Sequence, residues 1–245
     1  DKDEKTYQWA MFIQDDYSIT DQLTLNAGVR YDFYSIFGST VNPRVGLIYS
    51  PWKSTTFKLL YGEAFRAPNQ AELHNTVGTI LPNKDLKPEK LNTLEFIVEH
   101  YFTQQLRAEL NVFHTEIHEN IRSSPVGNNQ SRYQNIGDVE SLGVEGQIEN
   151  TWGDGFQGRL SYSWQDTTDI NTGERLTNSP EHMVKLNLIA PLWQDKVFLG
   201  FETQYMSNRK ILAKPANGGA GGKVDDYVIS NITVYTQNWV KGLEL

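Results

Sequence analysis

The sequence predicts an all-β chain that folds as an antiparallel up-and-down sheet of the kind found in transmembrane barrels. Three patterns support this prediction. Apolar and polar residues alternate along many segments, short polar turns alternate with longer connections, and aromatic residues gather at the short-turn ends. The segments run for about ten residues, which suits a tilted strand crossing the hydrocarbon layer, whereas strands of soluble sheets average about five or six.

The overall composition does not by itself separate a soluble protein from a membrane barrel. The 245 residues are 38% apolar and their mean hydropathy is -0.52, but a barrel that exposes every second residue to lipid also has a low average. No segment approaches the roughly 18 consecutive apolar residues of a transmembrane helix, so any membrane contact would be made by strands. The net charge of -8, with scattered acidic residues, argues against nucleic acid as a partner, and the absence of cysteine excludes disulfides and thiolate metal sites.

Both ends of the chain are interpreted as cuts. It opens with DKDEKTYQW, which contains neither an initiator methionine nor a leader sequence, and it closes with VKGLEL. The last residues, from Leu243, would begin a twelfth strand.

The strands are predicted from alternation with a period of two. In the first, within residues 6–19, Tyr7, Trp9, Met11 and Ile13 share a face. Ten further strands are predicted at residues 23–33, 44–50, 56–65, 93–101, 106–117, 133–150, 156–166, 182–190, 197–207 and 227–236.

The stretch from residue 141 to 166 shows the alternation most clearly. Leu142, Val144 and Ile148 share one face, and Leu160 and Trp164 share the corresponding face after the turn. The intervening residues are too polar for the core of a soluble sandwich. We therefore expect the apolar face to meet lipid and the polar face to line a wet or plugged lumen.

The connections are predicted to differ at the two ends of the sheet. Short turns are expected at residues 18–22, 50–54, 102–105, 151–155, 191–196 and 237–242. Longer connections fall between them, at residues 35–42, 67–91, 119–132, 167–180 and 208–226. Strict alternation places every short turn at one end and every long loop at the other, as in outer-membrane barrels.

Aromatic residues near the short turns are interpreted as an interfacial girdle. They are Tyr17, Tyr49, Trp52, Tyr101, Phe102, Trp152, Phe156, Trp193, Tyr235 and Trp239. Amphipathic rings prefer the headgroup level of a bilayer. The alternative, that aromatic residues are simply common in strands, explains a single hairpin better than a recurrence over successive hairpins.

Four ordered segments resemble the C-terminal part of the barrel of TonB-dependent outer-membrane receptors. They are YGEAFRAPNQAELH, NKDLKPEKLNTLEFIVE, YQNIGDVESLGVEGQIE and NSPEHMVKLNLIAPL. The matching positions are Phe65, Arg66, Ala67, Pro68, Glu72 and Leu73, then residues 86–89, then Asn135, Gly137, Gly143, Val144 and Glu145.

The resemblance implies a barrel of about twenty-two strands with a plugged lumen, in the outer membrane of a Gram-negative bacterium. Such a receptor imports a scarce ligand with energy passed on by TonB. The predicted strands would match the tenth to the twentieth, so residues 1–245 are expected to be a partial barrel domain, with the plug, the TonB box and the last strands outside them. Because two edge strands would then lack partners in lipid, we expect these residues alone not to form a stable pore.

The resemblance also points to the ligand and to the residues that meet it. A ferric siderophore is favoured because it is the commonest cargo of the family, with haem or cobalamin as alternatives and no resident cofactor. In the longest connection the candidates are Asn69, Glu72, His74 and Lys84. His74 would be an axial ligand if the cargo were haem, because imidazole suits iron; no other metal ligand is predicted.

Cationic and aromatic residues of the other segments complete the candidate site. Arg66, Arg132 and Arg209 with Lys210 could attract an anionic chelate, and Tyr133 or Tyr205 could stack on its rings. Pairing of each arginine with lumenal Asp or Glu remains an equal alternative.

The residue patterns give no support to an enzyme. His114 and His118 would lie about 13 Å apart on a strand, too far for one metal ion, and are expected at the external rim. GGAGG at residues 218–222 lacks the Gly-Lys-Ser/Thr step of a phosphate loop. Two other classes stay open: a passive porin or outer-membrane enzyme of twelve strands, and a soluble sheet protein such as an adhesin.

Overall fold

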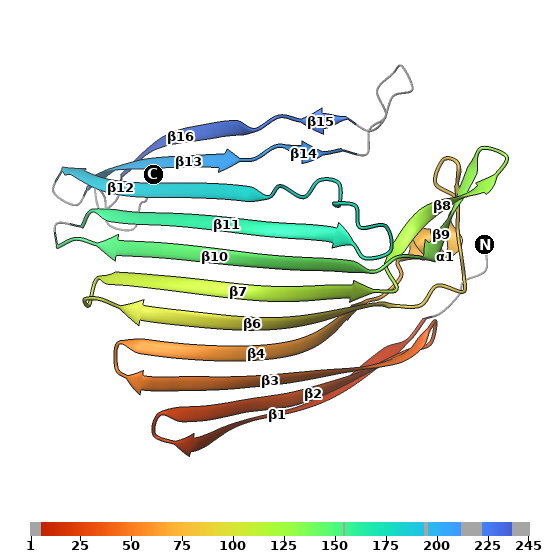
Figure 1. Ribbon diagram of the computed structural model, residues 1–245, viewed down its shortest axis with the longest axis horizontal. Coiled ribbons are helices and arrows are strands. Elements are labelled where there is room, and N and C mark those ends of the chain that lie inside the picture. Colours follow the sequence, from red (N-terminus) through yellow and green to blue (C-terminus); the bar gives the residue numbers. More distant parts are fainter. Residues whose placement is uncertain (1–5, 154, 194–195, 212–221, 237–245) are drawn as a thin grey trace.

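The main element is one antiparallel sheet of eleven strands, each paired with the next one along the chain (Figure 1). The structure, a computed structural model, describes residues 6–153, 155–193, 196–211 and 222–236. The strands are β1 (Gln8–Thr20), β2 (Leu23–Tyr34), β3 (Gly38–Trp52), β4 (Thr55–Arg66), β6 (Glu89–Tyr101), β7 (Leu106–His118), β10 (Val139–Thr151), β11 (Gln157–Asp169), β12 (His182–Trp193), β13 (Val197–Met206) and β16 (Tyr227–Thr236). The predicted all-β, up-and-down, partial barrel is confirmed, and the sheet is not closed.

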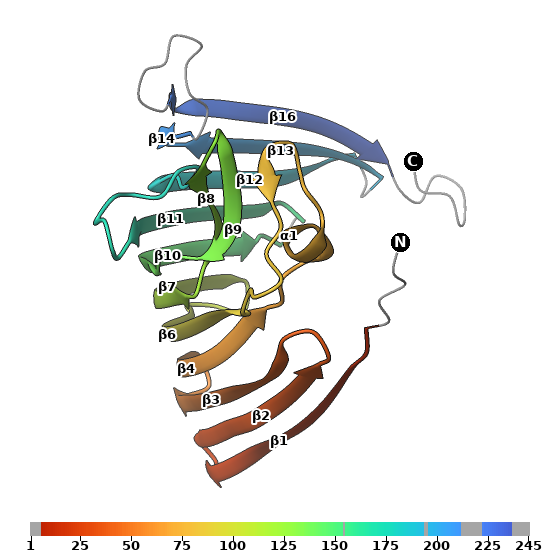
Figure 2. The same ribbon diagram turned by 90° about the vertical axis from the view of Figure 1, so that its right-hand side faces the viewer.

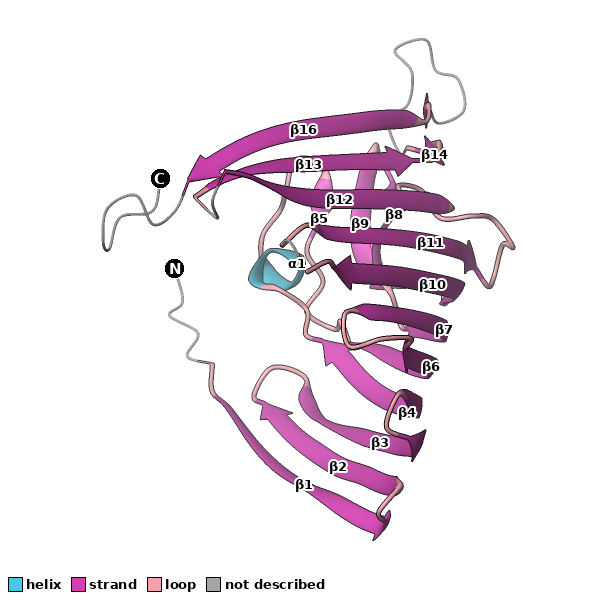
Figure 3. Cartoon of the chain, turned by 90° about the vertical axis from the view of Figure 1, so that its left-hand side faces the viewer, coloured by secondary structure: helices cyan, strands magenta, loops and turns pink. Residues whose placement is uncertain are grey.

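Shorter elements lie in the long connections at one end of the sheet. They are α1 (Gln70–His74), β5 (Ile80–Leu81), β8 (Ile121–Gly127), β9 (Gln130–Asn135), β14 (Arg209–Lys210) and β15 (Lys223–Val224). The sheet curves, and α1 lies within its concave side (Figures 2 and 3). Within the described residues, no helix is both long enough and apolar enough to cross a membrane.

The strand register separates an apolar face from a polar face. Val144 on β10 lies opposite Val112 on β7 and Trp164 on β11, while its neighbour Glu145 lies opposite Asn111 and Ser163. Because paired residues share a face, these rows alternate between apolar and polar across the sheet. The alternation predicted for the segment from residue 141 to 166 is therefore present in three dimensions.

The concave face is the polar one. Arg66 and Glu89 are register partners, so they lie on the same face. Arg66 bonds to Glu72 in α1, which lies within the concave side, and the same face of β6 continues through Thr93, Glu95 and Glu99. The apolar rows accordingly point outward from the convex face.

Few apolar side chains are buried by the protein itself. The buried ones in the described residues are Leu73, Leu86, Ile121, Val139 and Phe198, whereas many large apolar residues of the sheet are exposed. The cluster of Leu73, Leu86 and Ile121 lies in the connections, not in the sheet. A sheet with so little internal core needs an apolar surrounding for its convex face.

Two long connections differ from the prediction. The segment predicted as one strand over residues 133–150 is divided into β9 and β10, because Gly137 adopts a left-handed φ of 87° and interrupts the extended chain. The connection predicted at residues 35–42 is only a turn at residues 35–37, because β3 begins at Gly38 with a φ of 93°. Alternation of short and long connections is therefore wrong at this hairpin.

The other long connections carry structure that the sequence analysis treated as loop. Residues 119–132 form β8 and the start of β9, and residues 67–91 contain α1 and β5. Most strands also extend beyond their predicted limits, since β-pairing continues into the polar residues above the apolar rows.

The aromatic girdle is present in part. Tyr17, Trp52, Trp152 and Trp193 are largely exposed near the short turns. Tyr235 differs, because its ring stacks on Phe198 with 4.9 Å between centroids and the register places the pair on the polar face. The predicted turn at residues 237–242, Trp239 and the twelfth strand lie outside the described residues, as does most of the GGAGG segment.

Gly143 lies beneath the ring of Phe113, so we expect Gly143→Ala to destabilise the barrel. A Cβ atom there would overlap Phe113 Cζ and lie 2.9 Å from the carbonyl oxygen of Trp164. Such overpacking costs about 1–3 kcal/mol, measurable as a lower urea midpoint of the intact protein. The control is Gly146→Ala, where the nearest atom, Leu110 Cδ1, is 4.0 Å away. Equal midpoints for the two variants would contradict this packing.

The direction in which each side chain faces predicts whether a spin label at that position meets lipid or water. Spin labels at the positions of Val144, Leu160 and Leu186 in the intact protein should be relaxed strongly by oxygen, which dissolves in lipid. They should be relaxed only weakly by a water-soluble nickel chelate. Labels at Glu145 and Ser161, which follow Val144 and Leu160 in the sequence and face the lumen, should show the opposite preference. A water signal at the first three positions would contradict the apolar exterior.

Candidate functional site

Two connections fold together into one unit, here called the loop module, which consists of residues 67–88 and 119–138. Its helix α1 begins with a capping box: the Asn69 side chain accepts from the Glu72 amide at 2.9 Å, and Glu72 accepts from the Asn69 amide at 2.8 Å. This reciprocal pair satisfies two amides at the first turn and allows so short a helix to form. The sequence encodes it directly as Asn-x-x-Glu.

A three-stranded sheet joins the two connections. β8 and β9 form a hairpin whose tip, Asn128 and Asn129, has φ values of 51° and 57°, a left-handed pair that asparagine tolerates well. β5 pairs in parallel with β9, Ile80 opposite Ser131 and Leu81 opposite Arg132. Residues some fifty positions apart in the sequence are thereby hydrogen-bonded.

A small apolar core holds the module. Leu73, Leu86 and Ile121 are buried against one another, and the half-buried Tyr133 packs on them. Leu73 comes from α1, Leu86 from the segment before β6, and Ile121 from the start of β8. The core therefore ties both connections to a common centre.

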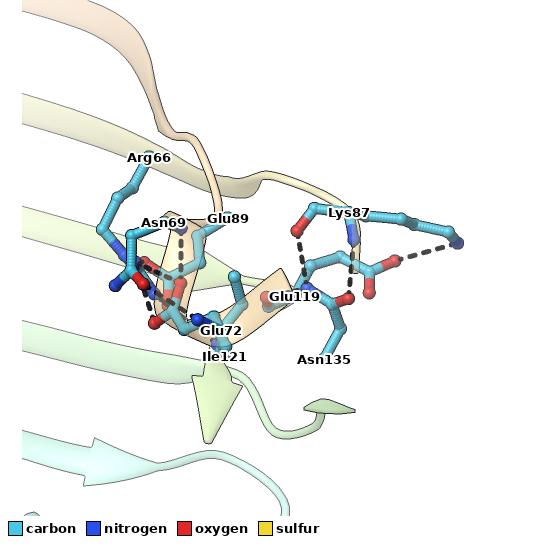
Figure 4. A network of polar contacts seen from close by, with 8 residues as sticks. All are labelled: Arg66, Asn69, Glu72, Lys87, Glu89, Glu119, Ile121 and Asn135. Atoms are coloured by element: carbon cyan, nitrogen blue, oxygen red, sulfur yellow. Dashed lines mark hydrogen bonds and ion pairs between the residues drawn. The ribbon is translucent and has the colours of Figure 1, made fainter. Parts of the chain in front are cut away.

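Arg66 links the module to the main sheet (Figure 4). Its Nε and Nη2 donate to the two oxygens of Glu89 at 2.6 and 2.8 Å, and its Nη1 donates to both oxygens of Glu72 at 3.1 and 3.2 Å. Glu89 also accepts from the Ile121 amide at 2.7 Å. One guanidinium between two carboxylates thus fastens β4, β6, α1 and β8 together.

Asn135 is a second junction of the network (Figure 4). Its Oδ1 accepts from the Lys87 amide at 2.8 Å, and its Nδ2 donates to the carbonyl oxygens of Lys87 at 2.9 Å and of Glu119 at 2.7 Å. The Lys87 ammonium also lies 3.5 Å from the Glu119 carboxylate. Because an amide side chain can donate and accept at once, Asn135 joins both connections where a carboxylate could not.

The network fixes the charge of its carboxylates. Burial raises the pKa of Glu89, but the hydrogen bonds from Arg66 and from the Ile121 amide, with the positive charges of Arg66 and Arg122, outweigh burial and lower this pKa. The hydrogen bond to Glu89 raises the pKa of Arg66. Both groups lie at the loop end of the sheet, above its apolar rows. The outward-facing residues at this level, Lys90 and His118, are polar.

Most of the predicted site residues lie in the module or, like Arg66 at the end of β4, contact it. Arg66, Asn69 and Glu72 contact one another in the network described above. His74 is in the last turn of α1, where it lines a pocket of about 280 Å³ together with Lys84. Of the two alternatives given for Arg66, the structure shows the pairing with carboxylates, Glu72 and Glu89.

Of the two remaining arginines, Arg132 lies in the module and Arg209 lies outside it. Arg132 on β9 donates to the Pro82 carbonyl at 3.3 Å and to Asn83 Oδ1 at 3.4 Å, both neutral acceptors. Arg209 lies on β14, outside the module, with its Nη1 3.4 Å from Met206 Sδ and its guanidinium 5.7 Å from the centroid of the Tyr227 ring.

The strand register places Tyr205, another predicted site residue, on the outward face of the sheet and not on the lumen side. It pairs with Val184 and Val228 in an outward apolar row of β12, β13 and β16. The sequence contains the signal, because Leu199 and Phe201 share the parity of Tyr205. Glu89 and Asn135 were quoted in motifs but not predicted as site residues, since their partners lie far away in the sequence.

The two histidines of β7 are engaged by carboxylates at the rim. His114 Nε2 lies 2.7 Å from Glu140 Oε1, and His118 lies 3.3 Å from Glu116 and 3.4 Å from Asp138. In the part of the chain that the structure describes, no group of three or more His, Cys, Asp or Glu residues is placed to hold a metal ion.

Comparison with known sequences decides the family. A model described as TonB dependent receptor-like, beta-barrel, matches residues 1–245. The chain belongs to the TonB-dependent receptor family. The resemblance predicted from the four motifs is confirmed, as is the location in a Gram-negative outer membrane, so the convex face meets lipid and the concave face lines the lumen of a receptor barrel.

Two curated relatives cover most of the chain. The iron-regulated outer membrane virulence protein of Vibrio cholerae is 26% identical over 92% of the chain, which spans 37% of that protein. The vitamin B12 transporter BtuB of the same species is 29% identical over 78% of the chain and 30% of its own length. The chain thus spans only 30% to 37% of the length of these two relatives.

Solved TonB-dependent receptors share the fold. The siderophore receptor PirA from Acinetobacter baumannii superposes with a TM-score of 0.80 at 20% identity, covering 94% of this chain and 39% of its own. The ferric enterobactin receptor PfeA of Pseudomonas aeruginosa, in complex with enterobactin, gives 0.78 at 21% identity, covering 95% of this chain and 38% of its own.

The lowered pKa of Glu89 predicts that the loop module loosens in acid. A carboxylate whose pKa is lower in the folded than in the unfolded state stabilises the fold at pH values above its ordinary pKa, near 4.5. This contribution is lost as the pH falls through the lowered pKa. The protection factor of the Ile121 amide, measured by hydrogen exchange on the intact receptor, should therefore fall as the pH is lowered below about 4.5.

Two variants test the assignment of this pH dependence. Glu89→Gln should remove the acid-dependent step, because the amide does not titrate. Glu119→Gln, which alters only the half-exposed pair with Lys87, should keep it. A protection factor of Ile121 that stays constant in the unaltered receptor as the pH is lowered through the acid range would contradict the assignment.

Proposed function

We propose that the intact protein binds a ferric siderophore and imports it across the outer membrane with energy supplied through TonB. The observation that carries the proposal is family membership together with relatives and structural neighbours whose names point to iron. The first curated relative is an iron-regulated outer membrane protein, and the neighbours by fold include siderophore receptors. Family membership speaks for a transport receptor; import of this cargo, and the partnership with TonB, are our inference.

The loop module supplies a surface that suits such a ligand. Ferric siderophores are often anionic, and Arg132 is exposed on β9 with only neutral acceptors as its hydrogen-bond partners. Tyr133 follows it on β9, and its side chain faces the opposite side, where it packs on the module core. An exposed arginine without a paired carboxylate can bind an anionic chelate by charge.

The other predicted residues are assigned different parts in this proposal. Arg66, Asn69 and Glu72 shape the module, because their charges and hydrogen-bonding groups are used inside it. His74, on the same helix, and Arg209, on β14, would contact ligand at the margin of the binding surface. Cobalamin is the second candidate, because the vitamin B12 transporter is also a relative.

Binding to the intact receptor distinguishes the cargoes. We expect a ferric catecholate siderophore to bind, and haem and cobalamin to bind much more weakly, in intrinsic fluorescence quenching of the detergent-solubilised protein. Arg132→Gln should weaken ferric siderophore binding about tenfold, the value of one charge-assisted contact.

The matched control removes a cation at the opposite end of the barrel. Lys53→Gln, in the short turn between β3 and β4, should leave the affinity unchanged. Preferential binding of cobalamin or haem would refute the siderophore assignment, and equal effects of the two substitutions would refute the role of Arg132.

A further inference from the structure

The three methionines of the chain lie in different surroundings. Met11 on β1 is the register partner of Tyr31 in an outward apolar row, and it is 63% exposed on that face. Met183 on β12 and Met206 at the end of β13 are register partners of each other, and both are half-buried. Because Met206 follows the outward-facing Tyr205, this pair faces the lumen, at its loop end. Its two sulfur atoms therefore lie where water-soluble molecules enter from outside the cell.

Two strong hydrogen-bond donors are directed at the sulfur of Met206. Its Sδ accepts the Tyr227 hydroxyl at 3.2 Å and Arg209 Nη1 at 3.4 Å. Tyr227 is the register partner of Met206 on β16, and Arg209 begins β14 three residues further along the chain. Among the described residues, the sulfur of Met183 receives only a longer contact, from Gln204 Nε2 at 3.9 Å. Because a thioether is a weak acceptor, the donors around Met206 are better suited to an oxygen atom at that place.

The charge of Arg209 is not neutralised by a carboxylate of the described residues. None of the ion pairs among them includes Arg209, and its guanidinium lies 5.7 Å from the centroid of the Tyr227 ring. Asp225 and Asp226, which directly precede Tyr227, are exposed and make no ion pair with it. The cation is thus held beside Met206 by a sulfur atom and a ring, and both contacts are modest. A strongly polar acceptor at Met206 would hold it more firmly.

Oxidation of the thioether supplies such an acceptor, because it adds an oxygen atom to the sulfur. When hydrogen peroxide reacts with methionine, the sulfur lone pair attacks one oxygen, the O–O bond breaks and an S–O bond forms. Sulfur loses two electrons to the peroxide, and the proton of the transferred oxygen passes to the departing hydroxide, which leaves as water. The transferred oxygen becomes negative while it bonds to sulfur, at the place to which the donors of Tyr227 and Arg209 point. Donors placed where charge develops lower the barrier of a reaction.

We propose that Met206 is an oxidation site, at which a peroxide forms a sulfoxide whose oxygen accepts hydrogen bonds from Tyr227 and Arg209. The sulfoxide joins the ends of β13, β14 and β16, which lie together at the loop end of the sheet (Figure 1). Arg209 is thereby held against the barrel wall. One consequence rests on the proposed function: an Arg209 bound to the sulfoxide no longer contacts an anionic chelate, so oxidation lowers the affinity of the receptor for its ligand.

The rate of oxidation at each methionine tests the proposal. The intact receptor in detergent is treated with dilute hydrogen peroxide, and the sulfoxide at each methionine is followed over time by mass spectrometry of its peptides. Met206 should be oxidised about tenfold faster than Met183, which is the effect of one charge-assisted hydrogen bond. Equal rates at Met183 and Met206 in the unaltered receptor would overturn the oxidation site.

Two variants separate the effect of the donors from that of simple exposure. Tyr227→Phe keeps the ring and removes the hydroxyl, and Arg209→Gln removes the cation; each should bring the rate at Met206 close to that at Met183. The matched control is Tyr205→Phe, which removes the hydroxyl of the adjacent, outward-facing tyrosine and should leave the rate unchanged. Fast oxidation of Met206 in both Tyr227→Phe and Arg209→Gln would overturn the role of the donors.

Ligand binding tests the consequence for Arg209 separately. The oxidised receptor should bind the ferric siderophore about threefold more weakly than the untreated receptor. Met206→Leu, which has a side chain of similar volume without sulfur, should show no loss after the same treatment. An unchanged affinity of the oxidised receptor, or an equal loss in Met206→Leu, would overturn the consequence. If the siderophore does not bind the untreated receptor, the proposed function fails, while the oxidation rates still decide the assignment of Met206.

Discussion

The pairing of backbone amides and carbonyls in hydrocarbon is the constraint on which the rest of the structure depends. A strand in lipid has no water to replace a missing partner, so each must lie between two neighbours. β10 shows this fully, because residues 139–150 pair with β7 on one side and with β11 on the other. Once every strand is held in register, the side chains have only two directions, and the alternation of the sequence becomes a division between lipid and lumen.

The polar face has its own form of order, which is pairing between charges on adjacent strands. Arg107 on β7 reaches Glu99 on β6 and Glu149 on β10, and Lys58 and Arg159 extend the chain of ion pairs to β4 and β11. Such pairs use the lumenal charges to join strands. A basic residue on the polar face is thus informative about ligands only when its partners are known, which the sequence alone does not reveal.

The strands could be predicted because their signal is local, whereas the loop module could not because its signal is not. Alternation over residues 6–19 or 141–166 is visible in any window of the sequence. The division between β9 and β10 depends on Gly137, whose conformation is set by the contacts around it. The β5 and β9 pairing joins segments that no sequence pattern connects, so both connections were taken for irregular loops.

The candidate site shows the same difference between what local sequence predicts and what only the fold reveals. Arg66, Asn69, Glu72 and His74 lie near one another, as residues close in sequence do, and their contact with a ligand stays a prediction. Their engagement with Glu89 and Ile121 needed the fold.

The parallel bridge between β5 and β9 has a consequence for the history and engineering of such receptors. Two surface segments that share a strand pair, a core and the Asn135 junction cannot diverge independently, since a substitution in one changes the fit of the other. Transplanting a new recognition surface from a related protein onto this barrel therefore requires moving residues 67–88 and 119–138 as a matched set. A single exchanged segment would leave its counterpart without a fold of its own.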